Sequence, residues 1–489
     1  MKHANILSID VGSSSIRGSI VNSELDVLGT WSIAMAPNHP APNFVEYDGN
    51  AIKNAALQII ELACTFGPTI SGISITNQRA TTVVWDATTA KPVGPVLSWM
   101  DLRTAAMCLG LAANGLSVAP NQSATKVAFL ASLASPDNLA NLRFGTLDTY
   151  LVWILTNGKS HLTDHTNAGM TGFIQDASLT WDHRVLDALG LPPTLLPSIV
   201  ASQSYFGEVN HSGTILPILG LIGDQQASMV GQGCFAVGDT KITFGTGTIL
   251  DRNVGQIPPR ETRRLPNGTF PVVAYSDSKT ITWANEAIGL GSGSMLNWLF
   301  SMGILTSIHQ ANQVDSNFRS HSRLYAVPAN TGLGTPEWDF GARSLYHGID
   351  LSTTKADFVA ATLDSIAQLG SDLIEASEKD TGVVAEFIHA DGGMTANSAF
   401  MQMVADATGI EIRSARTREA STLGAAVLAF RQLDSDIDSI WKSEVKITGA
   451  TYNPREPKES KQWLLRREAW SEIKALSLAS VPEYSAVKF

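Results

Sequence analysis

Cysteine is scarce in this sequence of 489 residues, which holds only Cys64, Cys108 and Cys234. The three lie far apart in the chain and form no CxxC pair. An odd, dispersed set argues against a disulfide framework and against a cysteine-based zinc site. We therefore expect a protein that works in a reducing compartment.

Long apolar runs and an excess of basic charge are also missing. No stretch approaches the about 18 uninterrupted apolar residues that a membrane span needs. The N-terminal segment reaches Asp10 before an apolar core of the secretory type could form. Lysine and arginine number 34 against 45 acidic residues, a net charge of −11, so no global basic field attracts nucleic acid. We expect a cytoplasmic protein with neither a membrane nor a nucleic-acid partner.

The residues that are present indicate a folded α/β protein. Hydrophobic residues make up 44% of the chain, with 11 Trp and 17 Phe, which excludes a mainly disordered chain. At roughly 150 residues per domain the length suggests about three domains, and two large ones fit equally well. Strands are predicted over 5–10, 16–22, 70–77 and 81–86, with an amphipathic helix over 51–66. Mixed helices and strands of this kind are typical of an α/β domain.

The first candidate site is a hairpin with a tip of small residues, Asp10-Val-Gly-Ser-Ser-Ser-Ile-Arg17. Gly12 allows a tight turn, and Ser13 and Ser14 leave donors free for phosphate oxygens. Asp10 could hold a hydrated Mg²⁺, and Arg17 could pair with the same phosphate. An ordinary surface hairpin explains these residues equally well, because no Walker lysine follows the glycine and no helix begins there.

A second hairpin of the same kind is predicted over 238–250. Its tip, Thr243-Phe-Gly-Thr-Gly-Thr248, offers Thr246 and Gly247 as further backbone donors for phosphate, although a simple tight turn fits as well. The recurrence is too divergent to be a repeat by residue identity. It suggests two related halves, which we place at 1–240 and 241–489.

An aspartate between apolar residues and amides, Gly223-Asp-Gln-Gln-Ala227, is the third candidate. Asp224 could take a proton from a substrate hydroxyl while Gln225 holds a neighbouring hydroxyl. Asp224 could instead cap the helix that follows, and taken alone the cap is the favoured interpretation.

The second half ends in a glycine turn and a charged tail. A strand predicted over 386–390 is followed by Asp391-Gly-Gly-Met-Thr-Ala-Asn397, and a helix over 398–408 begins after it. The two glycines could let a flat base or a phosphate approach the backbone at the start of this helix. A simple glycine-rich turn explains the motif equally well. Helices are also predicted over 355–378 and 421–432. The mixed charges after Thr448 indicate a solvated face rather than an anion site. The central segment 144–187 is expected to form loops and short helices around a cleft.

The order of these motifs along the chain is more specific than any of them alone. The further segments are Thr76-Asn-Gln-Arg79 with Thr81–Asp86, Ser98–Thr104, Phe144–Thr149, Thr163–Ala168, Trp338–Arg343 and Thr422–Ala426. Together they resemble the FGGY carbohydrate kinases of the actin-like ATPase superfamily, and most closely the glycerol kinases, over nearly the whole chain.

This resemblance implies two ribonuclease-H-like α/β domains with ATP in the cleft between them. Asp224 would be the general base, and Asp10 would lie near Mg²⁺. The residues that would contact ATP are Ser13, Ser14 and Arg17 from one domain, and Thr246, Gly247, Gly293, Asn297, Gly393 and Asn397 from the other. Phosphoryl transfer requires mainly alignment and charge neutralisation, which backbone donors, Mg²⁺ and one carboxylate can supply.

The departures from the family pattern fall at the substrate. Arg79, Trp99, Asp224 and Gln225 match the substrate residues of glycerol kinases. Ala80, however, stands where those kinases keep a glutamate, and Asn121 stands where they keep a tyrosine. The resemblance therefore leaves glycerol in doubt, and these changes favour a longer polyol or ketose.

We expect an ATP-dependent kinase of a small polyol or sugar, with a homodimer as the candidate assembly. The alternatives are a glycerol kinase with a rearranged pocket, and a chaperone ATPase, filament protein or sugar-responsive repressor of the same fold. The chaperone and filament classes need an appended domain or a polymerising surface, and no such domain is evident after residue 430. A repressor needs a DNA-binding module, and residues 1–10 leave no room for one.

Overall fold

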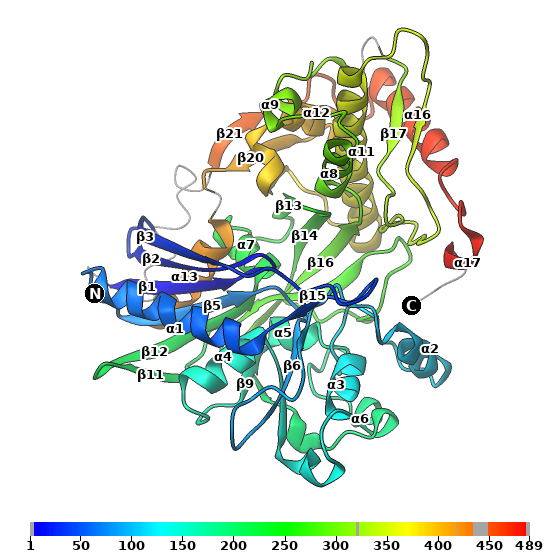
Figure 1. Ribbon diagram of the computed structural model, residues 1–489. Coiled ribbons are helices and arrows are strands. Elements are labelled where there is room, and N and C mark those ends of the chain that lie inside the picture. Colours follow the sequence, from blue (N-terminus) through cyan, green and yellow to red (C-terminus); the bar gives the residue numbers. More distant parts are fainter. Residues whose placement is uncertain (1–3, 319–321, 418, 434–447, 486–489) are drawn as a thin grey trace.

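The computed structural model describes residues 4–318, 322–417, 419–433 and 448–485, and two mixed β-sheets form the centres of its two lobes (Figure 1). The first sheet has the order β11 (Gly207–His211), β12 (Thr214–Gly223), β5 (Gly72–Asn77), β1 (Asn5–Val11), β2 (Ser15–Asn22), β3 (Val27–Ala34). The second has the order β15 (Phe270–Ser276), β16 (Ile281–Gly289), β14 (Thr248–Gly255), β13 (Thr240–Phe244), β19 (Phe387–Asp391), β20 (Glu411–Ala415), β21 (Thr448–Tyr452).

The two sheets share one topology. In the first, β1 and β2 form an antiparallel hairpin extended by β3, and β1 then pairs in parallel with β5, which pairs in parallel with β12. In the second, β13 and β14 form the hairpin extended by β16, and β13 pairs in parallel with β19, which pairs with β20. This match confirms the expected pair of ribonuclease-H-like α/β units.

Helices cover both sheets. Helix α1 (Gly49–Thr65) begins at the Asp48 cap and buries its apolar stripe against the first sheet, where Gly18 leaves room for Ile59. Helix α11 (Lys355–Thr381) begins with a capping box and packs with α12 (Ser398–Thr408) against the second sheet. No helix among the described residues is long and apolar enough to cross a bilayer.

Smaller elements complete the two lobes. A third sheet has the order β4 (Glu46–Tyr47), β7 (Val96–Leu97), β6 (Thr82–Asp86), β8 (Leu142–Thr146), and two-stranded pairs join β9 (Leu162–Asp164) to β10 (Ser198–Val200) and β17 (Tyr325–Val327) to β18 (Leu345–His347). The other helices are α2 (Ala105–Ala113), α3 (Ala124–Ala131), η1 (Pro136–Asn141), α4 (Leu147–Leu155), α5 (His165–Gly169), α6 (His183–Leu189), η2 (Pro193–Leu195), α7 (Asp224–Gly231), α8 (Gly293–Ser301), α9 (Ile308–Asn312), η3 (Gly393–Ala396), α13 (Ala420–Leu433), α16 (Lys461–Ala475) and α17 (Pro482–Ser485).

The central segment differs in part from its prediction. It does contain short helices, but all nine residues of α4 are buried. This helix is therefore enclosed by other elements rather than facing a cleft, and its one charged side chain, Asp148, accepts hydrogen bonds from Thr146 and Thr163.

The charged tail also differs in part from its prediction. Lys474 of α16 pairs with the buried Asp372 of α11 at 2.7 Å, and Arg467 pairs with Glu375 at 2.8 Å. Lys458 reaches Glu378 of the same helix at 2.9 Å. Other charged side chains of the tail are exposed, as expected for a solvated face, namely Arg455, Glu459, Lys461 and Glu468. The tail is therefore solvated on one side and bound to α11 through ion pairs on the other, and these acidic partners lie about 80 to 100 positions earlier in the chain.

Helices α7 and α13 cross closely between the two sheets (Figure 1). A Cβ on Gly424 of α13 would lie 1.8 Å from the carbonyl oxygen of Ala227. A Cβ on Gly231 of α7 would lie 1.8 Å from the carbonyl oxygen of Ala420. The backbones are therefore in direct contact, and only glycine fits at either position.

We predict that Gly424→Ala lowers the free energy of unfolding by about 1–3 kcal/mol or more, because an added methyl group must push two backbones apart. The midpoint of urea denaturation measures this loss. Gly110→Ala, in α2, is the matched control, since its Cβ would meet nothing within 4 Å. An equal effect of the two substitutions would contradict the close crossing.

Candidate active site

The tip of the first hairpin is open to a ligand. Gly12 closes the turn by donating its N–H to the carbonyl oxygen of Ser15 at 3.0 Å, and the side chains of Ser13 and Ser14 are exposed. Tyr47 Oη donates to the carbonyl oxygen of Ser13 at 2.9 Å, which supports the tip from behind. The serine hydroxyl groups and the turn are therefore available for an anion, as the sequence predicts.

Asp10 lies in an acidic environment at the base of this hairpin. Burial and, to a lesser extent, the neighbouring charges of Asp224 and Glu419 raise the pKa of its carboxyl group to about 7, although Arg17 opposes the shift. Arg17 Nη1 is held by Glu419 at 2.9 Å, immediately before α13. The fold thus brings together Asp10, Arg17 and Asp224, which are remote in sequence.

Asp224 is the first residue of α7. The N-cap position belongs to Gly223, so the interpretation of Asp224 as the helix cap is wrong. Its Oδ1 accepts a hydrogen bond from the Gln225 N–H at 2.8 Å and lies 3.8 Å from Arg79 Nε. Burial is the largest influence on its pKa, which is raised although Arg79 opposes the shift. The carboxylate therefore combines a raised proton affinity with a nearby cation.

A buried group of charged residues adjoins Asp224, and the sequence analysis missed most of it. Arg79 Nη1 pairs with Glu286 of β16 at 2.6 Å. Lys241 of β13 pairs with Asp251 of β14 at 2.9 Å, and both of these side chains are fully buried. Their local signal was a charged residue inside a largely uncharged strand: Lys241 alone in β13, Glu286 alone in β16, and Asp251 beside Arg252 in β14.

The second hairpin packs against the start of α8. Gly293 N–H donates to the carbonyl oxygen of Gly245 at 3.0 Å, and Ser294 N–H donates to that of Thr246 at 3.1 Å. A Cβ on Gly247 would lie 2.7 Å from the carbonyl oxygen of Gly289. The structure thus places Thr246, Gly247 and Gly293 together, with the Thr246 side chain exposed.

The glycine turn after β19 lies beside the same hairpin. A Cβ on Gly392 would come within 2.4 Å of the carbonyl oxygen of Phe244, whereas a Cβ on Gly393 would meet nothing within 4 Å. Asn297 is exposed on α8. Asn397 is the N-cap of α12, accepting from Phe400 N–H at 3.1 Å and donating to the Ala311 carbonyl at 2.7 Å. The open backbone at Gly393 suits a ligand, while the Asn397 side chain has a structural role.

A buried lysine joins the loops that carry Trp99 and Asn121. Lys126 Nζ donates to the carbonyl oxygen of Ser98 at 2.8 Å, to that of Trp99 at 3.3 Å and to that of Asn121 at 3.4 Å. Burial lowers the pKa of Lys126 to about 7. The Trp99 side chain remains 41% exposed. Lys126 therefore fixes the backbone of two predicted substrate residues.

Ala80 adopts a backbone conformation that is uncommon for alanine. Its φ is 58° and its side chain is buried. Its carbonyl oxygen accepts from Thr82 Oγ1 at 3.0 Å and from Ser123 Oγ at 3.2 Å. Two hydroxyl groups thus hold the loop between β5 and β6 that carries Arg79.

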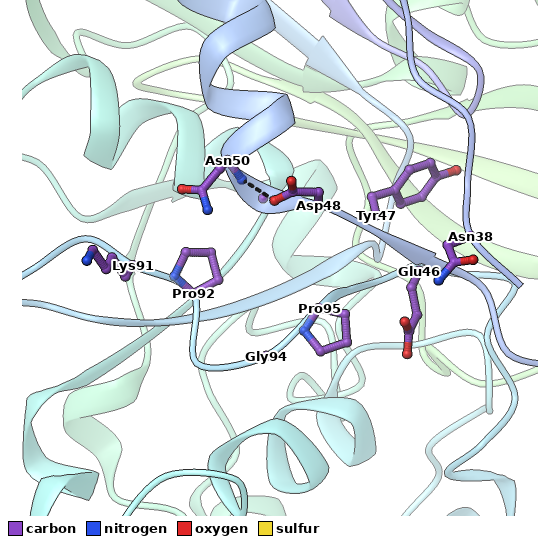
Figure 2. A pocket seen from close by; sticks show the side chains of 10 residues that line it. Asn38, Glu46, Tyr47, Asp48, Asn50, Lys91, Pro92, Gly94 and Pro95 are labelled. Atoms are coloured by element: carbon purple, nitrogen blue, oxygen red, sulfur yellow. Dashed lines mark hydrogen bonds between the residues drawn. The ribbon is translucent and has the colours of Figure 1, made fainter. Parts of the chain in front are cut away.

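A separate cavity of about 450 Å³ lies beside the start of α1 (Figure 2). Figure 2 shows Asp48 and Asn50 at the helix start near the loop of Lys91 and Pro92. Its lining comprises Asn38, Glu46, Tyr47, Asp48, Gly49, Asn50, Lys91, Pro92, Gly94 and Pro95. None of the sequence-predicted site residues lines it.

Comparisons with known proteins agree with this geometry. Residues 5–231 match the N-terminal domain, and residues 241–433 the C-terminal domain, of the FGGY family of carbohydrate kinases. The glycerol kinase of Petrotoga mobilis is 36% identical over 445 residues, which cover 87% of this chain and 89% of that protein. Glycerol kinase 1 of Saccharolobus solfataricus is 34% identical over 472 residues, covering 90% and 92%.

A solved structure supports the same assignment. Plasmodium falciparum glycerol kinase with ADP superposes with a TM-score of 0.86 at 26% identity, covering 100% of this chain and 99% of that chain. The shared sheet topology, the two hairpins and the match of both family domains lead to one conclusion. The chain belongs to the FGGY family of carbohydrate kinases.

Proposed function

We propose that the protein transfers the γ-phosphoryl group of ATP to a hydroxyl group of a small polyol or sugar, with Asp224 as the general base. One observation carries this proposal. Asp224 follows β12 in the same sheet as Asp10, near enough for its charge to raise the pKa of Asp10, and it lies 3.8 Å from Arg79 of the predicted substrate loop. A carboxylate between a phosphate-binding turn and a substrate loop can receive the proton of the attacking hydroxyl.

The reaction then follows from the positions of these groups. The acceptor hydroxyl gives its proton to Asp224 as its oxygen attacks the γ-phosphorus, and the bond from that phosphorus to the bridging oxygen of ADP breaks. Ser13, Ser14, Thr246 and Gly247 hold the phosphate oxygens in line for this displacement. Closing the two lobes around the reactants excludes water, which would compete as the acceptor.

The environment of Asp10 fits a divalent cation. Its carboxylate accepts no hydrogen bond from a described residue, and it lies among the charges of Asp224 and Glu419. Mg²⁺ prefers one or two carboxylates together with phosphate oxygens, and it would neutralise the charge on the phosphates. Asp10 is therefore the residue that we propose to hold Mg²⁺.

Glycerol is the second candidate acceptor. The relatives named above are glycerol kinases, which favours glycerol, whereas Ala80 and Asn121 favour an acceptor with more carbons and hydroxyl groups. At Ala80 a hydroxyl group would face a methyl group rather than a carboxylate, and an unmade hydrogen bond costs about 1–3 kcal/mol. The nucleotide contacts of Asn297, Gly393 and Asn397, a domain boundary at residue 240, a homodimer and a cytoplasmic location stay predictions.

Asp224→Asn should abolish phosphoryl transfer while leaving nucleotide binding nearly intact. Asparagine keeps the shape of the side chain but cannot accept the proton, and loss of a general base typically lowers kcat about 10²- to 10⁴-fold. Coupled ADP release measures turnover, and calorimetry measures ATP affinity. Asp26→Asn, on an exposed turn, is the control. A variant that keeps more than about a tenth of wild-type kcat would exclude Asp224 as the base.

Asp10→Asn should stabilise the protein in the absence of metal, and the gain should depend on pH. The pKa of Asp10 rises from 3.8 to about 7 on folding, so between these values the folded state holds a proton that the unfolded state has lost. Wild-type stability therefore falls as the pH rises from about 4 to 7. The gain in the free energy of unfolding from Asp10→Asn should therefore grow between about pH 4 and pH 7 and stay constant at higher pH.

Thermal unfolding at pH 4.5, 6 and 8 without Mg²⁺ measures this advantage, with Asp26→Asn as the control. The same variant should lose Mg²⁺-dependent turnover. A melting-temperature difference that is equal at all three pH values would contradict the raised pKa.

Ala80→Glu should shift acceptor preference toward glycerol. Glutamate supplies the acceptor atom that the loop lacks, and restoring a hydrogen bond of about 1–3 kcal/mol corresponds to roughly five- to 150-fold in relative kcat/KM. The measurement is the ratio of kcat/KM for glycerol to that for four- and five-carbon polyols and ketoses. Ala80→Met fills the same volume without an acceptor and should leave glycerol unfavoured. If wild type already prefers glycerol over the whole panel, the argument from Ala80 and Asn121 is wrong.

A further inference from the structure

The ammonium group of Lys241 donates two hydrogen bonds within the protein and forms an ion pair with Asp251. Lys241 Nζ lies 2.5 Å from Gln225 Oε1, 2.9 Å from Thr243 Oγ1 and 2.9 Å from Asp251 Oδ2. The Lys241 and Asp251 side chains are fully buried, so water does not compete for these bonds. The hydrogen bond from Lys241 to Gln225 is therefore shielded from solvent and holds both side chains in place.

This contact decides which way the Gln225 amide points. A lysine ammonium group donates hydrogen bonds and cannot accept them, so the Gln225 atom that faces it must be the carbonyl oxygen. The amide nitrogen then points away from Lys241. It donates to no described residue, and the Gln225 side chain is partly exposed. Two N–H donors are thus left for a ligand beside Asp224.

We propose that Lys241 and Asp251 are positioning residues that fix Gln225 as a hydrogen-bond donor to the phosphoryl acceptor. The acceptor substrate must then present a lone pair at this point. A hydroxyl or carbonyl oxygen meets this requirement, and a protonated amine does not. Polyols and ketoses both meet this requirement, whereas a substrate that places a protonated amino group against Gln225 is excluded. This inference rests on the proposed function, because it takes Gln225 to touch the acceptor.

The cost of the buried pair supports a role in specificity. Removing two charges from water costs several kcal/mol per ion, and apolar residues of similar volume often replace such pairs without loss of stability. The pair also joins two parts of the protein, because Gln225 lies in the N-terminal family domain while Lys241 and Asp251 lie in the C-terminal one. Thr243, which also accepts a hydrogen bond from Lys241, precedes the tip of the second hairpin.

The test compares acceptors that differ at one group. The panel is glycerol, dihydroxyacetone, 3-amino-1,2-propanediol and 2-amino-1,3-propanediol, together with erythritol and erythrulose. Wild type should phosphorylate the polyols and ketoses and discriminate against the amines at least tenfold in kcat/KM. Gln225→Glu keeps one oxygen on Lys241 and turns the other toward the substrate. It should accept the amines, keep the polyols and lose the ketoses.

The paired variant Lys241→Met with Asp251→Leu removes both charges together and releases the Gln225 amide. Discrimination against the amines should fall roughly five- to tenfold, as expected for one oriented hydrogen bond, and KM should rise more than kcat falls. Lys474→Met is the control, since Lys474 is another buried lysine with carboxylate partners, at 2.5 and 2.7 Å. It should lower the melting temperature without changing the preference. Unchanged discrimination in the paired variant would overturn the proposal.

A second measurement does not depend on turnover. If Lys241 faces Gln225, Gln225→Glu should cost less thermal stability in wild type than in the Lys241→Met, Asp251→Leu background. Equal shifts in melting temperature in the two backgrounds would overturn the contact. If wild type phosphorylates no member of the panel, the proposed function fails, and this thermal cycle alone decides whether Lys241 orients Gln225.

Discussion

The direct backbone contact between α7 and α13 is the constraint on which the rest of the site depends. Gly231 and Gly424 let the two helices approach until their backbones touch, and α13 then packs on the first sheet although it comes from the second half of the chain. Because Asp224 begins α7 and Glu419 precedes α13, the same contact brings the candidate base and the partner of Arg17 to the end of β1. A packing requirement thus determines where charge is placed.

Charge is concentrated where water is largely excluded. Arg79 with Glu286, and Lys241 with Asp251, are two adjoining buried ion pairs, since Asp251 and Glu286 are paired on the neighbouring strands β14 and β16. Such pairs add little net stability, since the desolvation of each ion offsets the attraction. Their effect is geometric, because an ion pair with Glu286 holds the Arg79 side chain and a hydrogen bond from Lys241 holds that of Gln225. A preorganised site of this kind suits phosphoryl transfer, in which alignment supplies most of the catalysis.

Local sequence patterns predicted the hairpins and helices well. Tip residues such as Gly12 and Gly247, and the apolar spacing of α1 and α11, depend on neighbours in the chain. Helix α12 lies where the sequence placed it, at Ser398–Thr408. The prediction of a solvated tail holds only in part, because Lys458 and Arg467 pair with acidic residues of α11 that lie 80 and 92 positions away. Asn397 was likewise assigned to the nucleotide from its motif alone. In the structure its side chain caps α12 and donates to the carbonyl oxygen of Ala311.

The sequence by itself determined the two hairpin tips, the α/β class, the kinase family and the identity of Asp224 and Gln225 as candidates. These follow from short-range steric preferences and from the order of motifs along one chain. Only the tertiary structure decided that Gly223, not Asp224, caps α7, that Glu286 holds Arg79, and that Lys241 turns the amide of Gln225 outward. The reason is physical, since hydrogen bonds and ion pairs depend on distance in space, and the strands that carry Lys241 and Glu286 reach this site only when the second sheet has formed.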